Sequence, residues 1–171
     1  MNEFFQDRKR IVSGFDGEHR FLSNFWISPF IYKGRIWKTS EHAYQAMKTT
    51  TVELQEHIRA LRWPSDAKKF GSSVRLRLGW KTDKYAVMRE ILMEKFTQNK
   101  NLLQRLLDTG DSNLVESNTW HDNDWGDCTC PECKHLPGKN MLGIMLMLVR
   151  KDLRVCEVFH RHGAANNNFN P

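Results

Sequence analysis

Apolar side chains recur every three or four positions through most of the chain beyond residue 40, and this spacing constrains the fold more than any other feature. The stripes fall in residues 41–47, 54–61, 85–96, 102–107 and 141–150. Because this spacing matches the 3.6-residue turn of an α-helix, each stripe predicts a helix with one apolar face. Pro64, Gly71 and Gly110 stand at expected helix ends.

Strand patterns are short and come early. Residues 12–15 and 30–37 have the composition of strands, and Lys33-Gly34 predicts a tight turn within the second. No Pro-, Gly- or Ser-rich linker divides the 171 residues, a length typical of one domain. We therefore expect an α+β fold. It should be a single helix-rich compact domain with a small early β-hairpin or sheet over residues 1–163, followed by a disordered, Asn-rich tail at 164–171.

The charge of the chain favours polyanionic partners. Lys and Arg number 26 against 20 Asp and Glu, which gives a net charge of +6. Cations are concentrated in residues 59–89, where they can hold phosphates or nucleic-acid backbone, although a solvated helix surface has the same composition. No apolar run approaches the roughly 20 residues that cross a membrane, and residues 1–10 lack the apolar core of a signal peptide. We therefore expect a cytoplasmic protein with no membrane partner.

The helix expected from Ser40 carries a polar stripe on an otherwise apolar surface. Glu41, Gln45 and Lys48 lie at i, i+4 and i+7 on one face, and Ser40 is expected to cap the first turn. A solvated face with a Glu–Lys pair would explain the stripe. The alternative is burial of Glu41 beside the helix amides, which would stabilise its charge and suits a functional acid.

Two other segments place aromatic rings beside polar groups. Trp120 and Trp125 flank Asp122 in a stretch without helical spacing. An indole face can stack a nucleobase, and a carboxylate can hold a ribose hydroxyl or activate water. Two core tryptophans with capping residues between them fit the same pattern. Asn24 and Phe25 form the other segment, in which Asn24 either bonds a base or sugar or makes a turn.

Three cysteines lie within six residues, a spacing that suits metal ligands better than disulfides. Cys128, Cys130, Cys133 and His135 together would supply the four ligands of a zinc ion. Four protein ligands leave no open position, so such a zinc would be structural and not catalytic.

Several of these segments, in this order, resemble the NADAR (NAD- and ADP-ribose-associated), or YbiA-like, family. The shared segments are Phe21-Leu22-Ser23-Asn24-Phe25, Ser40-Glu41-His42-Ala43-Tyr44-Gln45-Ala46 with Lys48, Lys95-Phe96, Leu107 with Thr109-Gly110-Asp111, Glu116, Asp122 with Trp125-Gly126, Gly138-Lys139-Asn140 with Leu142-Gly143, Met147 and Arg150. The resemblance as a whole covers nearly the whole chain, from about residue 12 to residue 154. The cysteine-rich insert departs from the family pattern.

The resemblance implies a helix-rich α+β fold and N-glycosidase chemistry that needs no metal or redox cofactor. It suggests removal of ADP-ribose from guanine bases in nucleic acid as the first expectation. Cleavage of early riboflavin-biosynthesis intermediates, which are free ribose phosphates, is the alternative within the same chemistry. A zinc-knuckle protein that binds nucleic acid without catalysis is the alternative from another class.

The resemblance suggests a role for Glu41, and the chemistry of C1–N cleavage suggests roles for the other residues. Glu41 falls on the key acidic position of the family and would be the catalytic carboxylate. Asp122 would hold the ribose hydroxyls or a second proton, and Lys48 would orient Glu41, bind phosphate or react with the opened ribose. The other expected substrate contacts are Asn24, Phe25, Tyr44, Gln45, Trp120, Trp125, Gly126 and Asn140.

Overall fold

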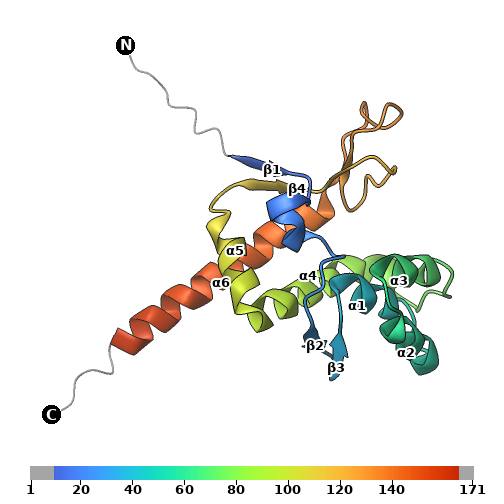
Figure 1. Cartoon of the computed structure of the whole chain (residues 1–171), viewed down its shortest axis with the longest axis horizontal. Helices are drawn as coiled ribbons and strands as arrows, with labels where there is room; N and C mark the ends of the chain where they lie inside the picture. Colours follow the sequence, from blue (N-terminus) through green and yellow to red (C-terminus); the bar gives the residue numbers. More distant parts are fainter. Residues whose placement is uncertain (1–9, 166–171) are drawn as a thin grey trace.

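The computed structural model describes residues 10–165, with the side chains through Cys156. Helices make up most of this part of the chain (Figure 1). They are α1 (Ser40–Ala46), α2 (Val52–Ala60), α3 (Pro64–Gly71), α4 (Trp80–Gln98), α5 (Lys100–Asp108) and α6 (Met141–Ala165), with the 3-10 helix η1 (Gly17–Leu22) before them. The strands are β1 (Ile11–Ser13), β2 (Phe30–Tyr32), β3 (Arg35–Trp37), β4 (Asn113–Val115), β5 (Ser117–Asn118) and β6 (Asp127–Cys128).

The strands pair two by two. β2 and β3 form the expected antiparallel hairpin, and its turn residues Lys33 and Gly34 both have positive φ. This is the backbone of a type I′ turn, in which glycine carries no steric cost. β1 pairs in parallel with β4, and β5 pairs in parallel with β6. The predicted helix-rich α+β fold is therefore confirmed, although its strands form several small sheets.

The core lies where the two longest helices pack against each other. Figure 1 shows α4 and α6 running through the molecule, with α1, α2 and α3 gathered around one end of α4. Ile91, Phe96 and Leu146 from these helices are fully buried, as is Trp37 from the hairpin. The hairpin packs on α4, so the early strands help to bury the apolar face of that helix.

Helix α1 is short, and every one of its residues is buried. Its cap differs from the expected one: Thr39 is the N-cap residue, and its hydroxyl accepts a hydrogen bond from the His42 amide at 3.2 Å. Ser40 is instead the first helical residue. Thr and Ser both cap helices well. Because the two are adjacent here, the sequence does not distinguish between helix starts that differ by one residue.

The last helix is longer than its apolar stripe predicts. Residues 141–150 were expected to form it, but α6 continues to Ala165 and so includes the first two residues of the predicted tail. Residues 166–171 of that tail lie outside the described residues. None of the helices in the described part is long and apolar enough to cross a membrane.

Candidate active site

A cavity of about 740 Å³ opens between α1, α3, the segment after η1 and the loop that joins β5 to β6. This volume lies within the roughly 300–1,000 Å³ typical of small-molecule sites. Its wall consists of Arg20, Ser23, Asn24, Phe25, Glu41, Tyr44, Gln45, Lys48, Ser65, Lys68, Lys69, Met88, Glu116, Asn118, Trp120, Asp122, Trp125 and Leu142. The structure thus brings the predicted site residues together around one cavity, with the exceptions of Gly126 and Asn140.

Glu41 is held inside this cavity wall with only 6% of its surface exposed. The Gln45 amide donates a hydrogen bond to Glu41 Oε1 at 2.7 Å, one helical turn further on. Burial raises the pKa of the Glu41 carboxyl, and the bond from Gln45 and the charges of Lys68 and Lys48 oppose that rise. The site therefore holds a poorly solvated carboxylate beside donors that favour its charged form.

Glu116 is a second, partly buried acid, and no role was predicted for it. It follows β4 directly and lines the cavity. Burial raises its pKa to about 7, and the charge of Asp122 adds to this effect while Lys68 opposes it. Its Oε2 atom is buried and has no hydrogen-bond partner among the described residues. In the sequence, Glu116 is marked only as one of the residues shared with the family pattern, and the structure adds its environment.

Lysines and one arginine give the cavity a positive lining. Lys48 Nζ donates to the Gly71 carbonyl at 3.2 Å, and burial lowers its pKa. Lys68 Nζ lies 5.9 Å from the ring centroid of Phe25 and 6.0 Å from that of Trp120, within cation–π range of both. Lys68 belongs to the basic stretch of the sequence, but nothing there distinguished it from its neighbours.

The two tryptophans of the β5–β6 loop have different surroundings. Trp120 is 58% exposed at the cavity wall, so its face is accessible for stacking. Trp125 packs edge-on against Tyr44 and Tyr85, with ring centroids 5.3 and 5.4 Å apart. The interpretation as core tryptophans therefore fits Trp125, which is largely a packing residue. The interpretation as a stacking surface fits Trp120, whose ring face is accessible.

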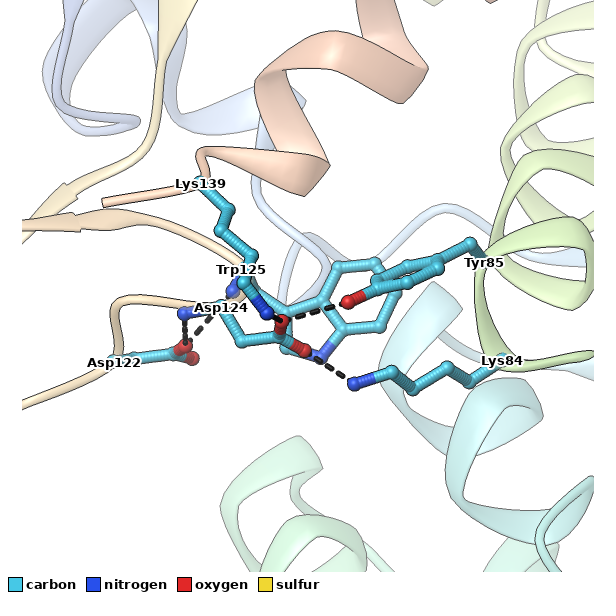
Figure 2. Close-up of polar contacts among 6 residues, drawn as sticks. All are labelled: Lys84, Tyr85, Asp122, Asp124, Trp125 and Lys139. Carbon is cyan, nitrogen blue, oxygen red and sulfur yellow. Dashed lines mark hydrogen bonds and ion pairs between the residues drawn. The ribbon is translucent and has the colours of Figure 1, made fainter. Parts of the chain in front are cut away.

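Ion pairs and a turn cap hold that loop in place (Figure 2). Asp122 Oδ1 accepts hydrogen bonds from the amides of Asp124 and Trp125, at 3.2 and 2.9 Å. Asp124 accepts from Lys84, from the Tyr85 hydroxyl at 2.7 Å and from Lys139 at 2.9 Å. Burial acts to raise the pKa of Asp124, but these three donors outweigh it and lower the pKa to about 2. Asp124 thus anchors the loop to α4, and Asp122 both shapes the turn and lines the cavity.

Asn140 and Gly126 lie outside the cavity wall but position Glu116. Asn140 Oδ1 accepts from the Glu116 amide at 3.0 Å, and its Nδ2 donates to the Leu114 carbonyl at 2.8 Å. At Gly126 a Cβ atom would lie only 2.3 Å from the Glu116 carbonyl oxygen, so the absence of a side chain permits this close approach. The structure therefore uses both residues to join the loop, β4 and the start of α6.

The segment of Asn24 and Phe25 is fixed from two sides. The Asn24 carbonyl accepts a hydrogen bond from the Glu41 amide at 3.0 Å, so it meets the first turn of α1. Lys95, which is fully buried on α4, donates to the carbonyls of Phe21 and Ser23 at 2.7 and 3.0 Å. Lys95 had no predicted role. The sequence pattern that indicates its burial is a lysine next to Phe96 within an apolar stripe.

The cysteine cluster has a different histidine from the predicted one. The ligand atoms of His121, Cys128, Cys130 and Cys133 all lie within 4.8 Å of one another. His135 is exposed and is not in this group, so the prediction that it completes the set is wrong. The chain reverses at His121, which has a φ of +65°, and the reversal brings a residue that is seven positions upstream of Cys128 back to the cysteines.

Comparisons with known proteins identify a family and several relatives of this chain. The NADAR domain model matches residues 4–154. The N-glycosidase YbiA of Escherichia coli strain K12 is 39% identical over 136 residues, which cover 78% of this chain and 81% of that protein. A riboflavin biosynthesis protein of Vibrio vulnificus is 39% identical over 143 residues, which cover 81% of this chain but only 37% of that protein.

A solved structure extends the agreement to the fold. The NMR structure of the E. coli protein YbiA matches with a TM-score of 0.77 and 34% identity, and the match covers 88% of each chain. The family model spans most of this chain, and the sequence and structural relatives agree with it. The chain therefore belongs to the NADAR family.

Proposed function

We propose that this protein hydrolyses the ribose C1–N bond of a phosphorylated riboside, and that its substrate is ADP-ribose joined to guanine in nucleic acid. The general chemistry follows from the family, because the E. coli relative is named an N-glycosidase. The observation that carries the proposal is the presence of two acids, the buried Glu41 and the partly buried Glu116, in one cavity with cations and aromatic rings.

In this mechanism Glu41 acts on the sugar. Cleavage of the C1–N bond leaves its electron pair on the base and develops positive charge at C1, as in an oxocarbenium ion. The Glu41 carboxylate stabilises that charge and takes a proton from the water that adds its hydroxyl to C1. Gln45, Lys68 and Lys48 favour the ionised form of Glu41 despite its burial.

Glu116 acts on the leaving base. A base departs readily only if a proton neutralises the negative charge that it acquires, and the donor must carry that proton at working pH. With a pKa of about 7, Glu116 is protonated in a large fraction of molecules at neutral pH. Two acids with different surroundings thus divide the roles of acid and base, the arrangement that glycosidases use.

The cavity lining supports a substrate with a diphosphate. Arg20, Lys48, Lys68 and Lys69 supply more positive charge than one phosphate needs. The exposed ring of Trp120 offers a stacking surface for a base at the mouth. The net charge of +6 favours approach to nucleic acid.

The second candidate substrate is a riboflavin-pathway intermediate, because one relative is named a riboflavin biosynthesis protein. A substrate panel separates the two. The purified protein is incubated with an ADP-ribosyl-guanine oligonucleotide and with early riboflavin intermediates, and released ADP-ribose or ribose phosphate is quantified. Faster release of ADP-ribose supports the proposal, and faster release of ribose phosphate overturns its substrate. Absence of hydrolysis in every arm would leave the zinc-knuckle binding protein as the better description.

A further inference from the structure

A cluster of soft metal ligands lies beside the cavity and outside the proposed chemistry. Cys128 and Cys130 are buried, and none of the described cysteines is in a disulfide. His121 Nδ1 lies 3.3 Å from Cys130 Sγ and 3.3 Å from Cys133 Sγ. In a tetrahedral zinc site, Zn–S and Zn–N bonds of about 2.3 and 2.0 Å place the ligand atoms about 3.5–3.8 Å apart. The cluster is therefore already close to the spacing that a zinc ion imposes.

We propose that His121, Cys128, Cys130 and Cys133 bind one Zn²⁺ ion, and that this ion fixes the wall of the cavity formed by the β5–β6 loop. Three thiolates and an imidazole are soft donors that select zinc over magnesium or calcium. They fill all four positions, so the ion is structural. The proposal is independent of the proposed function, since metal binding is measured without a substrate.

The surroundings of the ligands suit a metal ion. The Cys133 amide donates to Cys130 Sγ at 3.3 Å, which places a hydrogen-bond donor on a sulfur that would carry negative charge. On the far side of the imidazole, Glu132 Oε2 lies 3.8 Å from His121 Nε2. At this distance the carboxylate is not hydrogen-bonded to the ring, but its negative charge favours the positive charge that a metal ion places on the imidazole.

The backbone connects the metal ligands directly to residues of the cavity wall. His121 stands between Trp120 and Asp122, and both of these line the cavity. The other ligands belong to β6 and the turn after it, and β6 pairs with β5 through Asn118 and Cys128. A bound ion therefore joins the two ends of the loop and restricts the position of the Trp120 ring.

Metal analysis of the full chain tests the site. The protein is purified under reducing conditions, and its zinc is measured by elemental mass spectrometry, with one ion per chain expected. His121→Ala and Cys130→Ser should lose at least 80% of it. Two matched controls, His135→Ala and Cys156→Ser, replace the same residue types outside the cluster and should keep it.

Cobalt substitution keeps the test decisive if the ligand variants fold poorly. Wild-type protein stripped by a chelator and titrated with Co²⁺ should develop thiolate-to-cobalt absorption and the intense visible bands of a tetrahedral site, saturating at one equivalent. The proposed site is refuted if the reduced wild-type protein contains no stoichiometric metal and gives no cobalt spectrum. It is also refuted if both ligand variants retain their zinc, or if the bound metal is iron.

Hydrogen exchange tests the effect on the wall. Removal of zinc should speed amide exchange at least tenfold in residues 118–133 and leave α1 unchanged. Unchanged exchange in that loop would refute the positioning role, even if the ion binds.

Discussion

Two glutamates in one cavity differ in what surrounds each carboxyl group. Glu41 has a hydrogen bond from Gln45 and the charges of two lysines nearby, and Glu116 has a buried oxygen without a partner among the described residues. A carboxyl group with donors keeps its charge more easily than one without. Burial raises the pKa of both carboxyl groups, and the difference in donors is the basis for the proposed base, Glu41, and the proposed acid, Glu116.

Replacement of Glu41 by Gln tests the assignment of the base. The amide is isosteric and can still accept a hydrogen bond from Gln45, so the thermal midpoint should change by no more than about 3 °C, or roughly 1 kcal/mol. Loss of the carboxylate should lower kcat by about 10²–10⁴-fold, the usual contribution of such a group. Glu53→Gln, on the exposed surface of α2, is the matched control. Turnover near that of the control would refute the mechanism.

Replacement of Glu116 by Gln tests the effect of pH on stability. The folded-state pKa of about 7 lies above the ordinary 4.5, so the folded protein binds more protons than the unfolded chain between these values. The stability linked to Glu116 is therefore fully present below pH 4.5 and is lost as the pH rises through 7. The loss amounts to about 3 kcal/mol for a shift of this size.

Urea unfolding of wild type and Glu116→Gln at pH 5 and pH 8 measures this loss. Wild type should lose more unfolding free energy between the two pH values than the variant, in which the group cannot ionise. Parallel losses in both proteins would mean that Glu116 titrates normally. The same ionisation should reduce hydrolysis above pH 7, because the proton donor is then lost.

Sequence motifs could identify residues but not their surroundings. Glu41 and Gln45 share one face of α1, as their spacing predicts, whereas Lys48 lies just beyond the C-cap Met47 and lines the same cavity from there. Glu116 and Lys95 owe their environments to segments far away in the chain, which local spacing does not reveal. Likewise, the chain reversal at His121 brings this residue, and not His135, to the cysteines, and the sequence spacing does not show it.

At the scale of elements, the cavity depends on how closely α1 approaches α3. Gly71 ends α3, and a Cβ atom built there would lie 2.7 Å from the Cβ of Gln45. Only glycine permits this distance without a shift. The contact fixes the side chain that donates to Glu41, so the packing of two helices helps to position the proposed catalytic carboxylate.

Gly71→Ala should therefore lower both stability and activity. Alanine is the better helix former by about 1 kcal/mol, so propensity alone predicts stabilisation. Overpacking costs about 1–3 kcal/mol and should outweigh it. Urea unfolding and steady-state kinetics measure the two effects, with Ser72→Ala at the exposed neighbouring position as control. An increase in stability with normal turnover would contradict the prediction, because it would show that α3 can shift away from α1 to accommodate the added methyl group.

Local elements were predictable where neighbours in sequence define them. The Lys33-Gly34 turn and the helical stripes depend on adjacent residues, and the structure confirms both. The pairing of β1 with β4 joins Ile11 to Asn113 across about a hundred residues, and no local pattern predicts it. The extension of α6 beyond Arg150 was missed because polar residues there resemble a helix end, although no proline stops the helix.

At the scale of the whole molecule, charge decides which substrate can be reached. The net charge of +6 lies partly in the cavity, on Lys48 and Lys68, and partly in the wider basic stretch. The cavity cations can bind the phosphates of a small riboside. Cations outside it matter only if the substrate extends beyond the cavity, as nucleic acid does.

Salt dependence therefore distinguishes the two kinds of substrate. Each backbone phosphate neutralised by the protein contributes a slope of about −0.7 to −0.9 to log affinity against log salt. Three such contacts beyond the cavity would lower kcat/KM on an ADP-ribosylated oligonucleotide by roughly 20–40-fold between 50 and 200 mM salt. Free ADP-ribosyl-guanosine has no strand to contact, and it should lose much less over the same range. Equal losses on the two substrates would mean that the protein does not contact the strand, and the basic stretch would then be an ordinary solvated surface.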